Sequence, residues 1–235
     1  MTMRTGTRRR IVATLAGAPL AWAGSRWLGA TAAADEAATP AVPADQGLQR
    51  LLDGNKRFVT GALTSLNSLV QDRAQLAAGQ SPFAVVVCCS DSRVPPEIVF
   101  DQQPGQLFVV RTAGQVVDEA ARSSIAYGTD ALGASLVFVM GHAQCGAVKA
   151  AIADFAGKPI PGYAYRLVEG IGPAVQQTLD QPGDHLDNAI RANVAMGVEA
   201  LRTAEPVLAA DVRSGRVTVA GGYYDLASGV VSLLS

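Results

Sequence analysis

The chain has 235 residues, of which 49% are hydrophobic and 17% are charged, and its formal net charge at pH 7 is −1. This composition supports a sizeable apolar core and argues against global disorder. The near-neutral charge gives no support for a surface that binds nucleic acid or anionic lipid, because both need an excess of basic residues. Three cysteines are too few for a disulfide scaffold and fit a metal or nucleophile site better.

Residues 1–34 have the three-part pattern of an export signal. A basic stretch ends at Arg8-Arg9-Arg10, a mildly apolar run follows from Ile11 to Gly24, and Ala32-Ala33-Ala34 offers a cleavage pattern. The paired arginines resemble a twin-arginine signal, which predicts a periplasmic or secreted protein. The apolar run is short and rich in Gly and Ala, so we expect no stable membrane span. The alternatives are a disordered basic tail or an uncleaved anchor, and the protein is cytoplasmic if residues 1–34 are not a signal.

Residues 35–44 are rich in Ala and Pro and are interpreted as a linker, so one domain is expected over residues 45–235. A helix is predicted to open this domain and to end at Gly61. Its apolar residues recur at helical spacing: Leu48, Leu51, Leu52 and Phe58. A second short helix is predicted over residues 69–78, before Gly79.

Short apolar runs predict strands over residues 83–89, 106–111 and 136–140, and two terminal strands over 216–220 and 229–233. A continuous apolar run rich in Val is typical of a strand that is buried on both faces of a parallel sheet. Helical patterns fall between the strands, over residues 98–100, 118–132, 147–155 and 187–204. The alternation predicts an α/β fold with a mainly parallel central sheet and flanking helices. Residues 157–172, rich in Pro and Gly, are expected to be irregular.

Two of these strands are followed by side chains that can bind a metal. Cys89 ends the first strand, and His142 and Cys145 lie just past the end of the third. Ligands bind beyond the carboxyl ends of strands in an open parallel sheet, so we expect all three side chains at one edge. Two thiolates and an imidazole suit zinc, which prefers tetrahedral nitrogen and sulfur coordination. Three protein ligands leave a fourth position open, which is typical of a catalytic zinc site.

A carboxylate and a guanidinium follow Cys89 at alternate positions. Asp91 can ligate the zinc itself or accept a hydrogen bond from a zinc-bound water, and the sequence leaves both open. Arg93 can grip this carboxylate through two parallel hydrogen bonds, which would keep it ionised and oriented. Gly146 opens a predicted helix directly after Cys145, so its backbone N–H can donate to an anion beside the metal.

Each of these residues also has a simpler explanation. The cysteines could be core residues, the Asp–Arg pair could only stabilise a turn, and His142 could be a satisfied core histidine, as we expect for His185. We interpret Cys88 as a core residue, because successive strand residues point to opposite faces of the sheet. For the others we favour a metal site, because the simpler explanation must accept four coincidences at strand ends.

The sequence Cys89-Ser90-Asp91-Ser92-Arg93-Val94-Pro95, followed by Gly141-His142-Ala143-Gln144-Cys145-Gly146, resembles the β-class carbonic anhydrases. The likeness spans roughly residues 48–231 and includes the helix at 51–58 and the strand at 107–111. It implies this family's fold with an N-terminal helical arm. It also implies one zinc ion per subunit, held by Cys89, His142 and Cys145, with an Asp91–Arg93 dyad beside it.

The resemblance also implies a substrate pocket at a subunit interface. Gln80 matches the family's substrate-side amide donor, and Phe108 and Tyr127 match pocket-wall residues that come from the dimer partner. A homodimer or a higher assembly of dimers is therefore expected. One subclass of the family has a regulatory bicarbonate site with a Trp at the position of Val86, so this chain is expected in the other, constitutively open subclass. The family's Arg-Asn-x-x-Asn is Arg111-Thr112-Ala113-Gly114-Gln115 here, which leaves the hydrogen bonding of that loop open.

The activity that the resemblance implies is the hydration of carbon dioxide to bicarbonate and a proton. A CS2 or COS hydrolase on the same fold is an alternative, because access to the pocket cannot be judged from the sequence. Another is a zinc- or bicarbonate-binding protein without turnover, although a purely structural site needs neither Asp91 nor Arg93. The third is a cysteine nucleophile with His142 as its base, which leaves the Asp91–Arg93 pair unexplained.

Overall fold

The structure is a computed structural model that describes residues 42–64, 73–206 and 208–234. The predicted export signal and most of the predicted linker lie outside these residues and stay predictions, as does the start of the helix predicted over 69–78. Within the described ranges, every helix falls short of the length or the apolarity that a membrane crossing requires.

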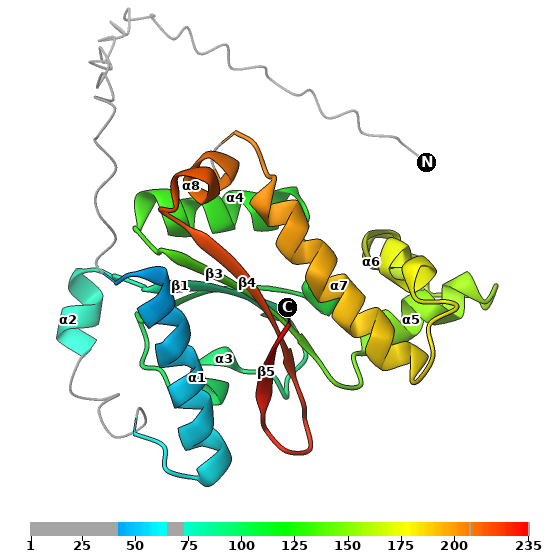
Figure 1. Ribbon diagram of the computed structural model, residues 1–235, viewed down its shortest axis with the longest axis horizontal. Coiled ribbons are helices and arrows are strands. Elements are labelled where there is room, and N and C mark those ends of the chain that lie inside the picture. The colour runs from blue at the N-terminus through cyan, green and yellow to red at the C-terminus, as the bar shows by residue number, and fades with distance from the viewer. Residues whose placement is uncertain (1–41, 65–72, 207, 235) are drawn as a thin grey trace, which may run out of the picture. The chain divides into compact units, whose positions relative to one another are not determined.

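A five-stranded sheet in the order β2-β1-β3-β4-β5 forms the centre of the domain (Figure 1). The strands are β1 (Ala84–Cys89), β2 (Leu107–Thr112), β3 (Leu136–His142), β4 (Thr218–Tyr224) and β5 (Val231–Leu234). The first four are parallel, and β5 pairs antiparallel with β4. Every residue of β1 and β3 is buried, which explains their unbroken apolar sequences. The predicted α/β fold with a mainly parallel sheet is confirmed.

Helices cover both faces of the sheet. The helices are α1 (Ala44–Thr60), α2 (Arg73–Ala78), α3 (Pro96–Val99), α4 (Glu119–Ala126), α5 (Gly146–Phe155), α6 (Tyr165–Gln177), α7 (His185–Arg202) and α8 (Leu208–Ser214). Residues of α1 and α3 pack with Val86, Cys88 and Phe138 on one face. Residues of α4 and α7 pack with Val85 and Val139 on the other. The alternating β1 residues therefore enter two different cores.

The structure corrects the prediction at residues 157–172. A short 3-10 turn, η4 (Gly162–Ala164), leads into α6, whose buried residues are Val168, Ile171, Ala174 and Val175. This apolar stripe packs against α5 and α7 and outweighs the low helix propensity of two glycines and of Pro173 inside the helix. The helix α8 was also not predicted. The helix predicted over 118–132 ends earlier and continues as a π-helical turn, η3 (Tyr127–Ala131).

Asn55 on α1 ties three distant segments together. Its Nδ2 donates to the carbonyl oxygens of Val99 (3.1 Å) and Gly229 (2.8 Å), and its Oδ1 accepts from the N–H of Val231 (2.8 Å). The side chain is buried, so water cannot replace Asn55 as the hydrogen-bond partner of these backbone groups. Next to it, Gly54 lets α1 approach α3, because a side-chain carbon there would clash with the Phe100 carbonyl oxygen.

We expect Asn55→Ala to lower the free energy of unfolding by about 2–4 kcal/mol. The substitution leaves buried backbone groups without hydrogen-bond partners, which costs ~1–3 kcal/mol for each group. Denaturant unfolding followed by circular dichroism measures this change. Gln49→Ala is the matched control on the same helix, because Gln49 hydrogen-bonds Asp53 on an exposed face. Its effect should stay within about 0.5 kcal/mol. Similar small losses in both variants would contradict this role of Asn55.

Candidate active site and metal centre

Three potential metal ligands meet at the carboxyl edge of the sheet. Cys89 is the last residue of β1, His142 is the last residue of β3, and Cys145 precedes the first residue of α5. All three are buried, and their ligand atoms lie within 4.8 Å of one another. The parallel pairing of Cys88 with Met140 sets Cys89 level with Gly141 and therefore brings residues 53 positions apart together. His142 lies within β3, not past its end as predicted.

The imidazole of His142 is oriented as a metal ligand. Its Nδ1 lies 2.9 Å from the carbonyl oxygen of Ala143, which can only accept, so Nδ1 carries the proton. Its Nε2 is buried and has no hydrogen-bond partner among the described residues. A buried nitrogen lone pair without a partner is costly, and a bound cation would satisfy it. With two thiols beside it, this donor set fits zinc.

Backbone N–H groups surround the thiol of Cys89. Gly114 donates to its Sγ at 3.2 Å and Asp91 donates to it at 3.4 Å. The hydrogen bond from Cys145 lowers the pKa of the Cys89 thiol most, and the backbone hydrogen bonds from Gly114 and Asp91 lower this pKa further. The same Cys89–Cys145 contact, together with burial, raises the pKa of Cys145. These donors favour the thiolate form of Cys89, and the neutral thiol form of Cys145.

Cys88 belongs to a different environment. It faces the core that contains Val86, Phe138 and Met140, whereas Cys89 packs with the helices α5 and α6. Burial raises the pKa of the Cys88 thiol to about 12, and all three cysteines are free. A neutral thiol in an apolar core is an inert packing residue, as expected from strand alternation.

Asp91 and Arg93 form a bidentate ion pair beside the ligands. The Nε of Arg93 donates to Oδ1 of Asp91 at 2.9 Å, and its second guanidinium nitrogen donates to Oδ2 at 2.7 Å. The backbone N–H of Arg93 adds a third bond at 3.0 Å. These hydrogen bonds hold the pKa of Asp91 well below its usual range. Oδ2 lies 3.9 Å from Nε2 of His142, so an ionised, oriented carboxylate faces the metal ligands.

Two residues that sequence reasoning did not assign to the site hold its loops. Arg111 donates to the carbonyl oxygens of Cys89 (3.0 Å) and Asp91 (2.6 Å) and so fixes the segment that carries both. Asn193 on α7 donates to the carbonyl oxygen of Gly114 at 2.9 Å. Arg111 was visible only as part of a family-like motif, and nothing local to the sequence marked Asn193.

The loop after β2, in which the sequence departs from the family motif, has its own hydrogen bonds. The 3-10 turn η2 (Ala113–Gln115) carries positive φ angles at Gly114 (68°) and Gln115 (46°). The hydroxyl of Thr112 donates to the carbonyl oxygen of Val116 at 2.8 Å and closes the turn. The buried amide of Gln115 has no hydrogen-bond partner among the described residues and lies over Gly141, whose missing side chain leaves room for it.

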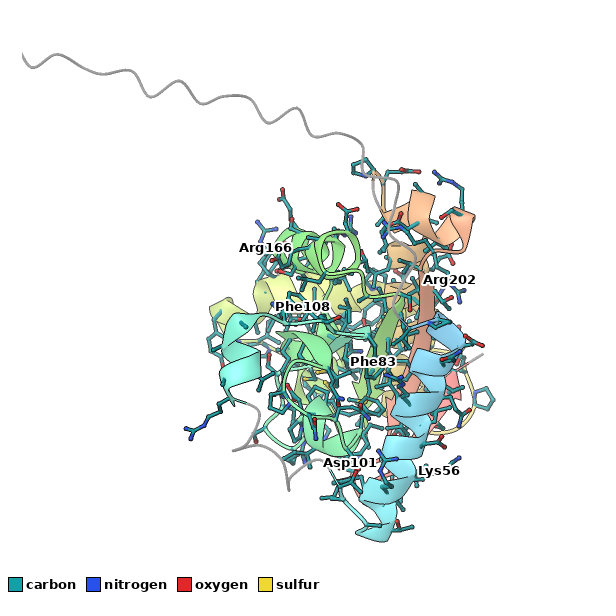
Figure 2. The ribbon with its side chains drawn as sticks, turned by 90° about the vertical axis from the view of Figure 1, so that its left-hand side faces the viewer. Lys56, Phe83, Asp101, Phe108, Arg166 and Arg202 are labelled. Carbon is teal, nitrogen blue, oxygen red and sulfur yellow. The ribbon has the colours of Figure 1, made fainter. Side chains whose placement is uncertain are left out.

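The four predicted substrate-side residues divide between the two ends of the sheet. Gly146 is exposed at the start of α5, next to the metal ligands. Gln80 is exposed before β1, and Phe108 on β2 (labelled in Figure 2) pairs with Val85. The rings of Phe108 and Tyr127 are 6.0 Å apart. Since strands rise ~3.3 Å per residue, Val85 lies about 13 Å from Cys89. The structure therefore does not bring Gln80, Phe108 or Tyr127 to the metal ligands of the same chain.

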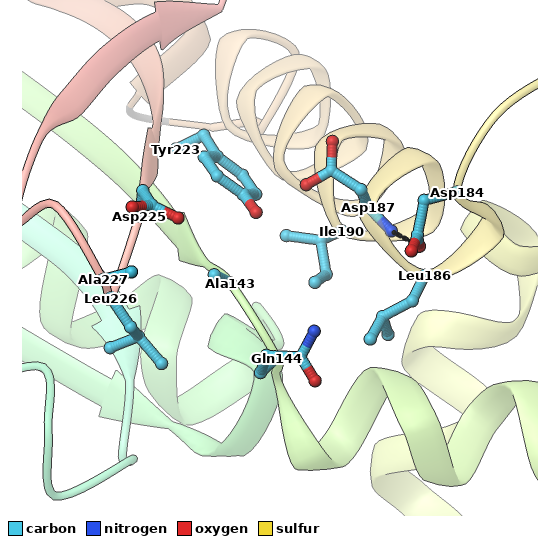
Figure 3. Close-up of a pocket in the computed structure, with 10 residues that line it drawn as sticks. All are labelled: Ala143, Gln144, Asp184, Leu186, Asp187, Ile190, Tyr223, Asp225, Leu226 and Ala227. Carbon is cyan, nitrogen blue, oxygen red and sulfur yellow. Dashed lines mark hydrogen bonds between the residues drawn. The ribbon is translucent and has the colours of Figure 1, made fainter.

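A cavity of about 450 Å³ is lined in part by Ala143 and Gln144, the two residues between His142 and Cys145. Figure 3 shows Tyr223 reaching into it from β4, opposite Ile190 and Asp187 on α7. Burial, and then Asp187, raises the pKa of Tyr223, and the guanidinium of Arg191 lies 4.0 Å from its ring. None of the three potential ligands lines this cavity, so it is separate from the metal centre.

The prediction for His185 is wrong. It is the first residue of α7 and is only partly buried, so it is not a core residue. Its buried Nε2 also has no hydrogen-bond partner among the described residues. It takes no part in the cluster of Cys89, His142 and Cys145.

Comparisons with known proteins agree with this site. A sequence model of the family described as carbonic anhydrase matches residues 84–231. Carbonic anhydrase 2 of Mycobacterium tuberculosis is 39% identical over 180 residues, covering 76% of this chain and 87% of that protein. The carbonic anhydrase of Mycolicibacterium smegmatis is 38% identical over 186 residues, covering 79% and 90%. The solved structure of the β-carbonic anhydrase CcaA aligns with a TM-score of 0.65 and 25% identity, covering 80% of this chain and 95% of that one. The chain therefore belongs to the β-class carbonic anhydrase family and carries the lyase activity of that family.

Proposed function

We propose that this carbonic anhydrase depends on zinc and catalyses the reversible reaction CO2 + H2O ⇌ HCO3⁻ + H⁺, with one zinc ion per subunit. The observation that carries the proposal is the buried, unpartnered Nε2 of His142 with two thiols in ligand distance. The ionised Asp91 beside them supports a reactive site over a structural one, because a structural site needs no such group. Zinc, when bound, supplies a water acidic enough to act as a nucleophile near neutral pH.

The residues of the chain orient the reactants. Asp91 accepts a hydrogen bond from the attacking water and so turns a lone pair of the water oxygen toward carbon dioxide. Arg93 fixes the direction of the Asp91 carboxylate. Because Arg93 keeps Asp91 ionised, Asp91 acts as an acceptor and not as a donor. The N–H of Gly146, at the start of α5, donates to the oxygen on which negative charge develops.

We also propose that the substrate pocket is completed by a second copy of the chain. Gln80 and Tyr127 are exposed, and with Phe108 they lie at the end of the sheet opposite to the metal ligands. Phe108 and Tyr127 together present an apolar surface, which suits a substrate with little polarity. In a two-fold dimer, each of the two pockets can combine the metal ligands of one chain with Gln80, Phe108 and Tyr127 of the other chain.

The metal proposal predicts different outcomes for the two adjacent cysteines. Cys89→Ser should reduce bound zinc from about one ion per chain to a small fraction of that, because one of three ligands is lost. Cys88→Ala is the matched control and should retain zinc, because Cys88 faces the opposite core. Elemental analysis after dialysis against a weak chelator measures both. Equal zinc contents in the two variants would show that the ligand set is wrong.

Asp91→Asn should keep its zinc and lose about 100-fold or more in kcat/KM for carbon dioxide hydration, because a neutral amide orients the water poorly. Stopped-flow pH-indicator assays measure the rate. Asp53→Asn, an exposed carboxylate on α1, is the control and should match the wild type. Sulfide release from CS2 and COS by the same wild-type sample tests the alternative substrates. The role of Asp91 would be refuted by a zinc-loaded Asp91→Asn enzyme that hydrates carbon dioxide normally.

The shared pocket predicts complementation between two inactive variants. Cys89→Ser chains and Gln80→Ala/Tyr127→Ala chains should each have low activity alone. Co-expressed, they should recover about a quarter of wild-type activity, because half of a random mixture is heterodimer with one intact pocket out of two. A mixture no more active than the mean of its two parents would place the pocket walls within one chain.

A further inference from the structure

Asn193 stands out on the buried face of α7, all of which lies in the described part of the chain. Its neighbours on that face are Ala189, Ile190, Val194, Val198 and Leu201. Asn193 is 7% exposed and is the polar residue in this otherwise apolar stripe. Burying a carboxamide costs free energy unless its hydrogen bonds are made, so packing alone would favour an apolar residue here.

The contact that Asn193 makes leads to the metal centre. Its Nδ2 donates to the carbonyl oxygen of Gly114 at 2.9 Å, although the two residues are 79 positions apart. The N–H of the same Gly114 donates to Sγ of Cys89 at 3.2 Å. One glycine therefore connects a buried side chain of α7 with a metal-binding sulfur.

Gly114 needs an external support to hold that N–H in place. Its φ of 68° lies in the left-handed region, and a side chain there would come within 2.7 Å of Ile171 and 3.0 Å of Ala147. Both the positive φ and the crowding favour glycine here, but glycine has more backbone freedom than any other residue. Its carbonyl and its N–H belong to the two peptide units that flank Gly114, so a hydrogen bond to the carbonyl holds one unit and restricts the rotations that would turn the N–H of the other away from Cys89.

We propose that Asn193 is a positioning residue of the metal centre, which acts through Gly114 to hold the hydrogen bond to Sγ of Cys89. This inference rests on the proposed zinc site and deepens it. A hydrogen bond to a metal-bound thiolate withdraws charge from the sulfur, so it sets how strongly that sulfur donates to the metal. Loss of the Asn193 contact should therefore alter the electronic state and the affinity of the metal, and not only the stability of the fold.

The test compares Asn193→Leu and the milder Asn193→Ser with Asn188→Ala in the full-length protein. Asn188 lies on the same helix and its Nδ2 donates to the carbonyl oxygen of Pro182, away from the metal ligands. Each protein is loaded with Co(II), whose thiolate charge-transfer absorption reports on sulfur donation. Zinc affinity is measured by competition with a chelator, and thermal unfolding is recorded for the metal-free proteins.

We expect both Asn193 variants to shift the charge-transfer band and to bind zinc about 10- to 100-fold more weakly, the range typical of lost outer-shell partners. Asn188→Ala should leave both readouts unchanged. The inference is overturned if Asn193→Ser, folded and loaded, has the wild-type spectrum and a zinc affinity within twofold of wild type. A fall in thermal stability alone would assign Asn193 a purely structural role and would also overturn it.

The wild-type measurements separate this inference from the proposed function. If the wild type binds zinc and does not hydrate carbon dioxide, the proposed reaction fails while the spectra still decide the role of Asn193. If the wild type hydrates carbon dioxide and the Asn193 variants keep its metal properties, the positioning role alone fails. If the wild type binds neither zinc nor Co(II), the metal centre and the positioning role fail together.

Discussion

The parallel register between β1 and β3 is the constraint on which the site depends. It sets Cys89 level with Gly141, so that His142 and the loop to Cys145 lie directly beside the end of β1. A slip of one residue would turn Cys89 into the core that now holds Cys88 and would present the wrong thiol at the edge. Such a slip would be costly, because every side chain of the strand would have to repack in the core on the opposite face.

The second requirement is compensation of buried negative charge. The buried sulfur of Cys89, whose donors favour a thiolate, lies within 4.8 Å of the ligand nitrogen of His142, and the partly buried carboxylate of Asp91 lies 3.9 Å from that imidazole, so both need partners. The backbone N–H groups of Gly114 and Asp91 donate hydrogen bonds to the sulfur of Cys89, and the guanidinium of Arg93 donates to the carboxylate of Asp91. Most of these donors belong to turns, where N–H groups are free of sheet pairing. The loops after the strands therefore supply the donors that compensate the negative charge, and the strands determine where the metal ligands lie.

Much of the fold and the ligand set could be predicted from the sequence, because both rest on local signals. Unbroken apolar runs marked β1 and β3, and the chemistry-bearing residues followed them directly. The helix α6 was missed because its stability comes from packing on α5 and α7, which outweighs Pro173 and the glycines. Asn193 was missed because its one informative contact joins residues 79 positions apart. His142 was predicted just past the end of the strand but is its last residue, because a polar residue after the apolar run gave no sign that its side chain would be as buried as those before it.

The positions of Gln80, Phe108 and Tyr127 carry a consequence for the edge of the sheet. β2 is an edge strand, and its outward-facing N–H and C=O groups would offer a template for unwanted pairing if they stayed uncovered. Phe108 and Val109 on this strand are only partly buried, and Tyr127 beside it is 52% exposed. In the proposed dimer, the contact that brings the rings of Phe108 and Tyr127 to the metal centre of the second chain would also cover this edge of β2. Assembly and a complete pocket would then depend on the same surface, so a substitution that weakens the contact should impair activity without touching any metal ligand.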